Sequence, residues 1–153
     1  MWIIIAIICG LLGYILAYVL TSRKYNDILR TQSLISSFNE SLASFQTTNK
    51  SLMPFFERKN YRGVIVFCPG PNCNKFLNLI DTNAVDVRYI DFIDNPDNGC
   101  ESIDKIGSIK GDVIIITVVT KFDEVYRKLR KKGETRPILS LHELTNNSIR
   151  ETL

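Results

Sequence analysis

The residues with the clearest potential for chemistry lie in one turn, Cys68-Pro-Gly-Pro-Asn-Cys73, between an apolar strand and an apolar-periodic helix. Where a strand turns directly into a helix, the first N–H groups of the helix lack internal partners and carry partial positive charge. Such junctions bind phosphates and carboxylates in α/β proteins. Gly70, Asn72 and Cys73 are therefore candidate binding residues, with Asn72 as the expected N-cap of the helix.

The turn is not accompanied by a recognisable catalytic or metal-binding set. Cys68 and Cys73 have C-x4-C spacing without a nearby histidine, whereas zinc sites use tighter pairs and four ligands. The sequence has no Ser/His/Asp arrangement, no H-E-x-x-H helix and no Walker lysine. His142, the only histidine, stands beside Glu143 and is interpreted as a capping or surface residue. We assign no catalytic residue and no metal ligand.

The elements that must position the turn begin near Tyr61. Strands are expected at four apolar runs, Val64–Phe67, Val85–Ile93, Val113–Val119 and Pro137–Leu141. Helices are expected after Asn72, across Lys121–Lys132 and in the polar tail after Leu141. Between them, residues 94–99 predict a turn, and Glu101–Lys110 a loose helical turn with Ile103 and Ile106 directed inward. Gly133 is expected to end the second helix.

Strands that alternate with helices predict an α/β fold with a small parallel sheet covered on both faces. With the four strands numbered along the chain, the expected order is 2-1-3-4. A ligand crevice should then open between the first and third strands, where the connections leave in opposite directions. Gly70 would face the exit of the third strand there, which adds Thr117 and Thr120 to the candidate site.

The segment Trp2–Leu20 contains no charged residue and has the length of a transmembrane helix across about 30 Å of hydrocarbon. A cleaved signal peptide is the alternative, but the apolar segment lacks a basic leading region and a small-x-small cleavage site. Arg23, Lys24 and Arg30 follow the segment and predict that the rest of the chain lies in the cytoplasm. The expected partner is a lipid bilayer, and the expected location is the cell membrane, with a single pass.

From Asp27 to Phe56 the apolar residues follow a heptad pattern that is typical of a coiled coil or of a long packed helix. One series contains Ile28, Ile35, Leu42, Asn49 and Phe56, and the other contains Thr31, Phe38, Phe45 and Leu52. The pattern predicts self-association through residues 28–56, or contact with a partner membrane protein. The alternative is an amphipathic helix packed on the membrane or back on the domain. Pro54 is expected to end or kink this helix.

The sequence therefore divides into a predicted transmembrane helix at residues 1–21, a helical stalk or coiled coil at 22–60 and an α/β domain at 61–153. The net charge is only +3, and the densest basic cluster, Lys128 with Arg130–Lys132, lacks the interleaved aromatic residues of a nucleic-acid surface. We expect no nucleic-acid partner and interpret this cluster as a solvated helix face.

The α/β part resembles the small Rossmann-like domains of bacterial surface-polysaccharide and sugar-nucleotide proteins. The matching stretches are Phe92–Asn95 (FIDN), Asp112–Ile116 (DVIII), Tyr126–Gly133 and Ile138–Leu144 (ILSLHEL). The resemblance covers about Arg62–Leu144 and implies a nucleotide or nucleotide-sugar ligand. It also implies that Asp94 accepts a hydrogen bond from a ribose hydroxyl, with Asp91 as a nearby substitute.

The turn departs from the G-x-G-x-x-G pattern, because its three places hold Cys68, Gly70 and Cys73. Pro69 and Pro71 also remove two N–H donors, so the turn should bind a pyrophosphate poorly and at most hold a single phosphate or carboxylate. Each of these candidate residues also has a purely structural interpretation. Gly70 could serve only to let the chain turn, both cysteines could be buried apolar side chains, and Asp94 could belong to an ordinary turn.

These observations predict a membrane-anchored, cytoplasmic Rossmann-like binding or scaffold module that is not itself catalytic. The resemblance places it in cell-envelope polysaccharide synthesis and implies that a nucleotide or nucleotide-sugar occupies the crevice near Gly70. Two alternatives remain open. The chain could be one subunit of a split membrane glycosyltransferase, or it could be a membrane-tethered nucleotide sensor.

Overall fold

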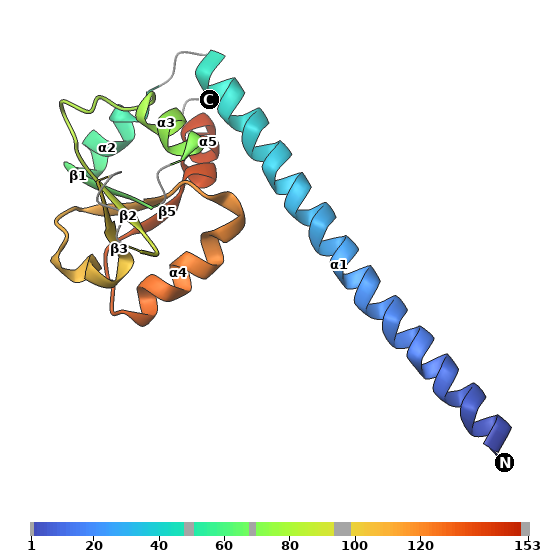
Figure 1. The fold of residues 1–153 in the computed structure, drawn as a ribbon. Helices are drawn as coiled ribbons and strands as arrows, with labels where there is room; N and C mark the ends of the chain where they lie inside the picture. The colour runs from blue at the N-terminus through green and yellow to red at the C-terminus, as the bar shows by residue number, and fades with distance from the viewer. Residues whose placement is uncertain (1, 48–50, 68–69, 94–98, 151–153) are drawn as a thin grey trace. The chain divides into compact units, whose positions relative to one another are not determined.

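The computed structural model describes residues 2–47, 51–67, 70–93 and 99–150, with the backbone alone at 2–9, 46–47 and 146–150 (Figure 1). The chain forms two compact units, residues 1–36 and residues 37–153. The boundary falls inside the first helix, α1 (Trp2–Thr47), which runs through the predicted transmembrane segment and most of the predicted stalk. The second unit therefore begins well before Tyr61.

The second unit is built on one parallel sheet of five strands in the order β3-β2-β1-β4-β5. The strands are β1 (Gly63–Phe67), β2 (Asp86–Asp91), β3 (Cys100–Ser102), β4 (Val113–Ile116) and β5 (Ile138–Ser140). The register pairs Val64 with Val87 on one side of β1 and with Val113 on the other. Continuous apolar runs suit these two central strands because both of their faces are covered.

The predicted order of the four strands is confirmed, since they correspond to β2-β1-β4-β5. The edge strand β3 was not predicted. It comprises Cys100 and the first two residues of Glu101–Lys110, the stretch predicted to form a loose helical turn. The next six residues form the 3₁₀ helix η2 (Ile103–Ser108), and its Ile103 and Ile106 side chains are buried as predicted.

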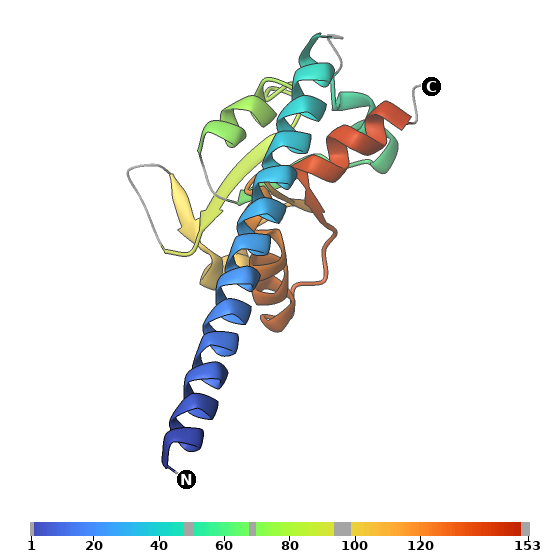
Figure 2. The same cartoon turned by 90° about the vertical axis from the view of Figure 1, so that its right-hand side faces the viewer.

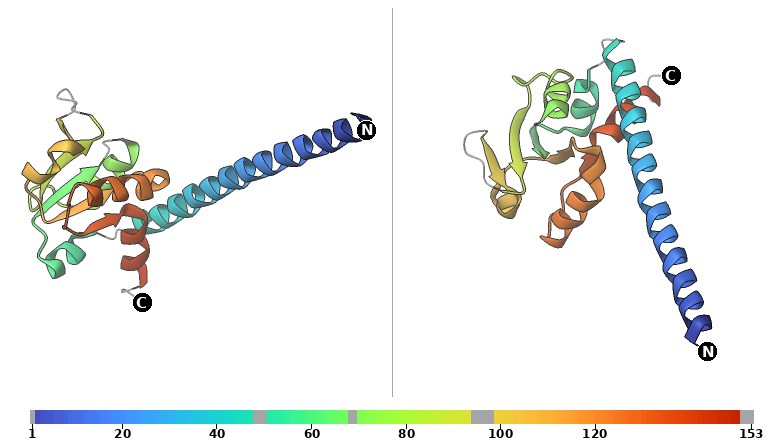
Figure 3. Two further views of the ribbon diagram at one scale, coloured as in Figure 1. Left: turned by 90° about the horizontal axis from the view of Figure 1, so that it is seen from below. Right: turned by 45° about the vertical axis from the view of Figure 1, so that its right-hand side comes forward.

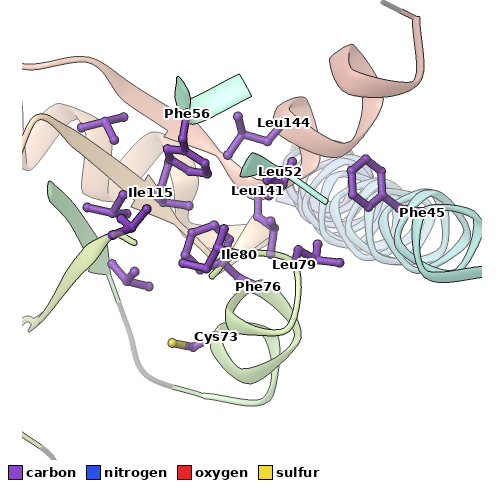
Figure 4. Packing of buried hydrophobic residues seen from close by; sticks show 14 of the residues in the cluster. Phe45, Leu52, Phe56, Cys73, Phe76, Leu79, Ile80, Ile115, Leu141 and Leu144 are labelled. Carbon is purple, nitrogen blue, oxygen red and sulfur yellow. The ribbon is translucent and has the colours of Figure 1, made fainter. Parts of the chain in front are cut away.

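Helices cover both faces of the sheet (Figures 1 and 3). One face carries α2 (Met53–Lys59), α3 (Pro71–Leu77), α5 (Leu141–Arg150) and the last turns of α1, and Figure 4 shows its packing. The opposite face carries η2 and α4 (Phe122–Lys131). Alternation along β1 divides its side chains between the two cores, with Val64 and Val66 on the first and Ile65 and Phe67 on the second.

The end of α1 belongs to the core of the second unit. Phe38, Leu42 and Phe45 are at most 2% exposed and pack in the same cluster as Leu141 and Leu144 of α5. Figure 2 shows α5 beside these turns of α1, and the Phe38 and His142 rings meet edge to face with centroids 6.1 Å apart. From Phe38 onward, the described apolar residues of the heptad pattern therefore pack on the chain's own domain, as the alternative interpretation predicted.

Pro54 was expected to end or kink the helix that precedes it, but it lies in the first turn of α2. A proline is favourable there because the first N–H groups of a helix need no internal acceptor. The heptad position Asn49 lies outside the described residues. Further along the domain, Gly133 follows the end of α4 with a φ of 81°, so the predicted glycine stop is confirmed.

Within the residues that the structure describes, no helix is long and apolar enough to cross a membrane. The predicted transmembrane segment starts with residues 1–9, whose side chains lie outside that description. From Leu11 to Leu20 every large apolar side chain of α1 is 38% or more exposed.

Candidate functional site

The carboxyl ends of β1 and β4 lie next to each other, as the predicted crevice requires. The Thr117 hydroxyl donates a hydrogen bond to the Phe67 carbonyl oxygen at 3.0 Å. The Asn72 side-chain amide donates to the Thr117 carbonyl oxygen at 3.3 Å. Two predicted site residues, Asn72 and Thr117, are thus brought together. Their contacts join the start of α3 to both central strands, and Thr117 is only 1% exposed.

The helix after the turn begins two residues earlier than predicted. Gly70, not Asn72, is the N-cap of α3, and Pro71 is its first residue. The Cys73 and Asn74 N–H groups both donate to the Gly70 carbonyl oxygen, at 2.8 and 3.2 Å. Since Pro71 has no N–H, only the Asn72 N–H of this first turn has no backbone acceptor among the described residues. This is a weak cradle for a phosphate.

Gly70 needs no glycine-specific conformation. Its backbone is extended (φ −160°, ψ −171°), which any residue can adopt, and a Cβ added there would meet nothing within 4 Å. The structure therefore provides no steric reason for a glycine at the centre of this turn. Cys68 and Pro69 lie outside the described residues.

Cys73 points into the protein. It is 2% exposed and belongs to the cluster that contains Phe76 and Val66. Figure 4 shows Cys73 and Phe76 among the residues of this cluster. Burial raises the pKa of the nearby Tyr89 hydroxyl, and the Cys73 and Cys100 thiols raise it further. This position supports the structural interpretation of Cys73 as a buried apolar side chain.

The remaining predicted site residues are not gathered at the Thr117 contact. Thr120 is exposed on the short 3₁₀ helix η3 (Val119–Lys121). Asp94 lies outside the described residues, so its predicted role stays untested. Its proposed substitute, Asp91, accepts a hydrogen bond from the Phe92 N–H at 2.7 Å and is half-buried.

At the opposite end of the two central strands, where β1 and β4 begin, lies a polar contact that sequence reasoning missed. The Asp112 carboxylate accepts hydrogen bonds from the Arg62 and Gly63 N–H groups, at 2.7 and 2.8 Å. The Asp112 N–H donates in return to the Gly63 carbonyl oxygen at 2.7 Å. The Gly63 and Arg62 hydrogen bonds hold the pKa of the Asp112 carboxyl below its usual range, and the charges of Arg136 and Arg62 lower it further.

A cavity of about 530 Å³ also opens at this end of the strands, and Glu134 and Arg136 form part of its wall. Arg136 forms an ion pair with Glu134, and its guanidinium donates to the Ile106, Ile109 and Gly111 carbonyl oxygens. The Arg136 hydrogen bond keeps the pKa of the Glu134 carboxyl below its usual range despite burial. All five guanidinium donors are accounted for by these contacts, so Arg136 holds the fold and is not directed at a ligand.

The capping of α5 was also missed, although the sequence contains a signal for it. The Glu143 N–H donates to the Ser140 hydroxyl at 3.0 Å, and the Ser140 N–H donates to the Glu143 carboxylate at 3.3 Å. This is the reciprocal capping box that the spacing S-x-x-E allows. It fixes the point where β5 becomes α5.

Among the residues that the structure describes, no group of three or more His, Cys, Asp or Glu side chains could hold a metal ion. In comparisons with known proteins, no family model, no curated protein and no solved structure matches the chain.

Proposed function

We propose that the chain is a membrane-tethered docking module whose α/β unit binds a partner and is not itself catalytic. The observation that carries this proposal is the hydrogen bonding at the ends of β1 and β4. Thr117 donates to Phe67, and Asn72 donates to Thr117, so these polar groups join the protein to itself. A catalytic site in that crevice would instead need polar groups directed at a substrate.

The tether is the first part of α1. Trp2–Leu20 is helical and uncharged, and at 1.5 Å per residue it extends about 28 Å, close to the thickness of a bilayer core. The exposed side chains of Leu11–Leu20 form a large apolar surface, which lipid would cover. Arg23 and Lys24 favour a cytoplasmic position for the α/β unit.

The setting of this module is proposed from the sequence resemblance alone. Rossmann-like domains of surface-polysaccharide proteins suggest a place in cell-envelope glycan synthesis, and we assign the nucleotide or nucleotide-sugar that the resemblance implies to the docked partner. The β3-β2-β1-β4-β5 order matches the first five strands of the doubly wound order that such domains use, which supports the resemblance at the level of topology. We place the docked partner, not this chain, in the role of the catalytic component.

Self-association was predicted for residues 28–56, and we retain it as a proposal only for the first part of that segment. Ile28 and Ile35 are 47% and 42% exposed, whereas Phe38, Leu42 and Phe45 are buried in the domain. The docked partner is therefore either a second copy that contacts Ile28 and Ile35 or a different membrane protein.

The tether is tested by alkaline carbonate extraction of membranes that contain the full chain. We expect the chain to stay in the membrane pellet, and the double variant Leu12→Arg with Leu16→Arg to be released. A matched control, Leu29→Arg with Leu34→Arg, places the same charges beyond the apolar segment and should stay in the pellet. Release of the unchanged chain would contradict the tether.

Docking is tested by chemical cross-linking in the same membranes followed by mass spectrometry. We expect one partner protein, or a second copy, to be cross-linked to residues of the α/β unit. Glycosyl transfer that appears only after that partner is added would favour the split glycosyltransferase alternative. Turnover of a nucleotide-sugar by the purified chain alone would refute the non-catalytic assignment.

A further inference from the structure

Four basic residues form a cationic surface along α4, which we name the α4 basic face: Lys121, Arg127, Lys128 and Lys131. Lys128 and Lys131 are three residues apart, and Arg127 and Lys131 are four apart, so helical spacing places them on one side. The opposite side of α4 contributes Val125 and Leu129 to the core, and both are fully buried. The α4 basic face is therefore directed away from the sheet.

Two of these cations are held over an aromatic ring. The Lys128 and Lys121 Nζ atoms lie 4.7 and 5.5 Å from the centroid of the Phe92 ring. The Phe92 ring is itself fixed against Phe67, edge to face, with centroids 5.0 Å apart. Cation–π attraction thus fixes two ammonium groups at the end of β2 without neutralising them.

None of the four side chains is paired with a carboxylate within the described part of the chain. Elsewhere in this unit basic residues do form such pairs, with Lys132 Nζ 2.7 Å from Asp104 Oδ1 and Arg136 bound to Glu134. Arg127 donates only to the Asp123 carbonyl oxygen, at 3.1 Å. Two exposed acidic residues, Asp123 and Glu124, lie beside the four in the first turn of α4, and four basic against two acidic residues leave an excess of positive charge.

The geometry points to the anionic headgroups of the tethering bilayer as the ligand of the α4 basic face. This inference rests on the proposed tether, because a covalent link of about 24 Å (residues 21–36 as a helix) holds the unit near the membrane. A row of surface cations attached to a membrane segment is the arrangement that anionic lipids attract. The face is a row and not a pocket, which suits a layer of phosphates better than one small molecule.

The test uses the full chain in nanodiscs made of phosphatidylcholine, with or without phosphatidylglycerol. Acetylation of individual lysines is followed by mass spectrometry. With the anionic lipid we expect Lys121, Lys128 and Lys131 to react about fivefold more slowly, and high salt to remove the difference. Lys59 of α2, Lys75 of α3 and Lys110 in the loop before β4 lie outside the α4 basic face and should react equally in both membranes.

A variant pair separates this face from charge in general. Arg127→Gln with Lys131→Gln should restore the reaction rates of Lys121 and Lys128, whereas Lys59→Gln with Lys110→Gln removes equal charge elsewhere and should not. Equal rates in the two kinds of nanodisc would overturn the inference. Protection that appears in both kinds only after an acidic protein is added would also overturn it.

Vesicle flotation distinguishes this failure from failure of the tether. The tether predicts flotation with neutral vesicles, whatever the α4 basic face does. A chain that floats with neutral vesicles but shows unaltered lysine reactivity with anionic lipid refutes the inference and retains the tether. A chain that floats with neither kind of vesicle refutes both.

Discussion

The Asp112 carboxylate accepts a hydrogen bond from the Gly63 N–H at 2.8 Å, and the Gly63 carbonyl oxygen accepts one from the Asp112 N–H at 2.7 Å. This reciprocal contact aligns the start of β1 with the start of β4, the two central strands of the sheet. The alignment in turn sets the register at which Phe67 and Thr117 meet at the other end.

Replacing Asp112 by alanine should destabilise the domain by about 0.5–1.5 kcal/mol, because two N–H groups at an exposed position lose their acceptor to water. Asp112→Asn keeps an oxygen acceptor and should cost less. The measurement is the urea midpoint of the full chain in detergent. As a control, Asp81→Ala alters an exposed aspartate that only closes a local turn, and it should cost less than Asp112→Ala. Equal midpoints for Asp112→Ala and the parent would contradict the role given to this contact.

The stability of the domain should fall in acid, because folding lowers the pKa values of Asp112 and Glu134. A carboxyl with a lowered pKa contributes stability that is fully present above its unfolded pKa, about 4, and is lost as the pH falls through its folded pKa. Urea midpoints should therefore decline below about pH 4. Asp112→Asn should decline less steeply, and an unchanged slope in that variant would refute the assignment.

Gly63→Ala should destabilise the sheet, while Gly70→Ala should not. A Cβ on Gly63 would lie 2.9 Å from the Gly111 Cα atom, and this backbone has little room to shift. Overpacking of this kind costs about 1–3 kcal/mol. At Gly70 the added Cβ meets nothing within 4 Å, so the change should be neutral or slightly stabilising. Thermal unfolding of the two variants compares them directly, and a loss at Gly70 equal to that at Gly63 would be inconsistent with the structure.

Leu42→Ala should destabilise the α/β unit by about 2–5 kcal/mol, because Leu42 is 2% exposed in its core. Ile35→Ala is the matched control one heptad earlier, where the side chain is 42% exposed, and it should change stability by less than about 0.5 kcal/mol. Denaturant midpoints measure both. If the two changes were equally mild, the end of α1 would not belong to this core.

The sequence predicted most of the sheet because buried parallel strands appear as continuous apolar runs, as in Val113–Ile116. The edge strand β3 has only Cys100, Glu101 and Ser102, which is too short a pattern to recognise. The heptad of α1 was visible, but spacing alone cannot tell whether Phe38 and Leu42 meet a second copy or their own domain. Their partner depends on tertiary structure.

The sequence predicted only part of the candidate site, because the rest of it also depends on tertiary structure. The topology that joins β1 to β4 was readable, and it brings Asn72 and Thr117 together. The orientation of Cys73 was not readable, because the start of α3, which lies two residues earlier than predicted, decides which side chains face the core. The contacts of Gly63, Gly111 and Asp112 bring together residues about 50 positions apart, so no local pattern indicates them.

Thermal unfolding of the full chain in detergent, with a panel of nucleotides and nucleotide-sugars, tests the central claim most directly. If Asn72 and Thr117 serve the fold and the chain docks a partner, no compound should raise the unfolding midpoint. A rise that Asn72→Ala abolishes, and that Asn78→Ala at the exposed end of α3 preserves, would contradict the claim and establish a ligand site in the crevice.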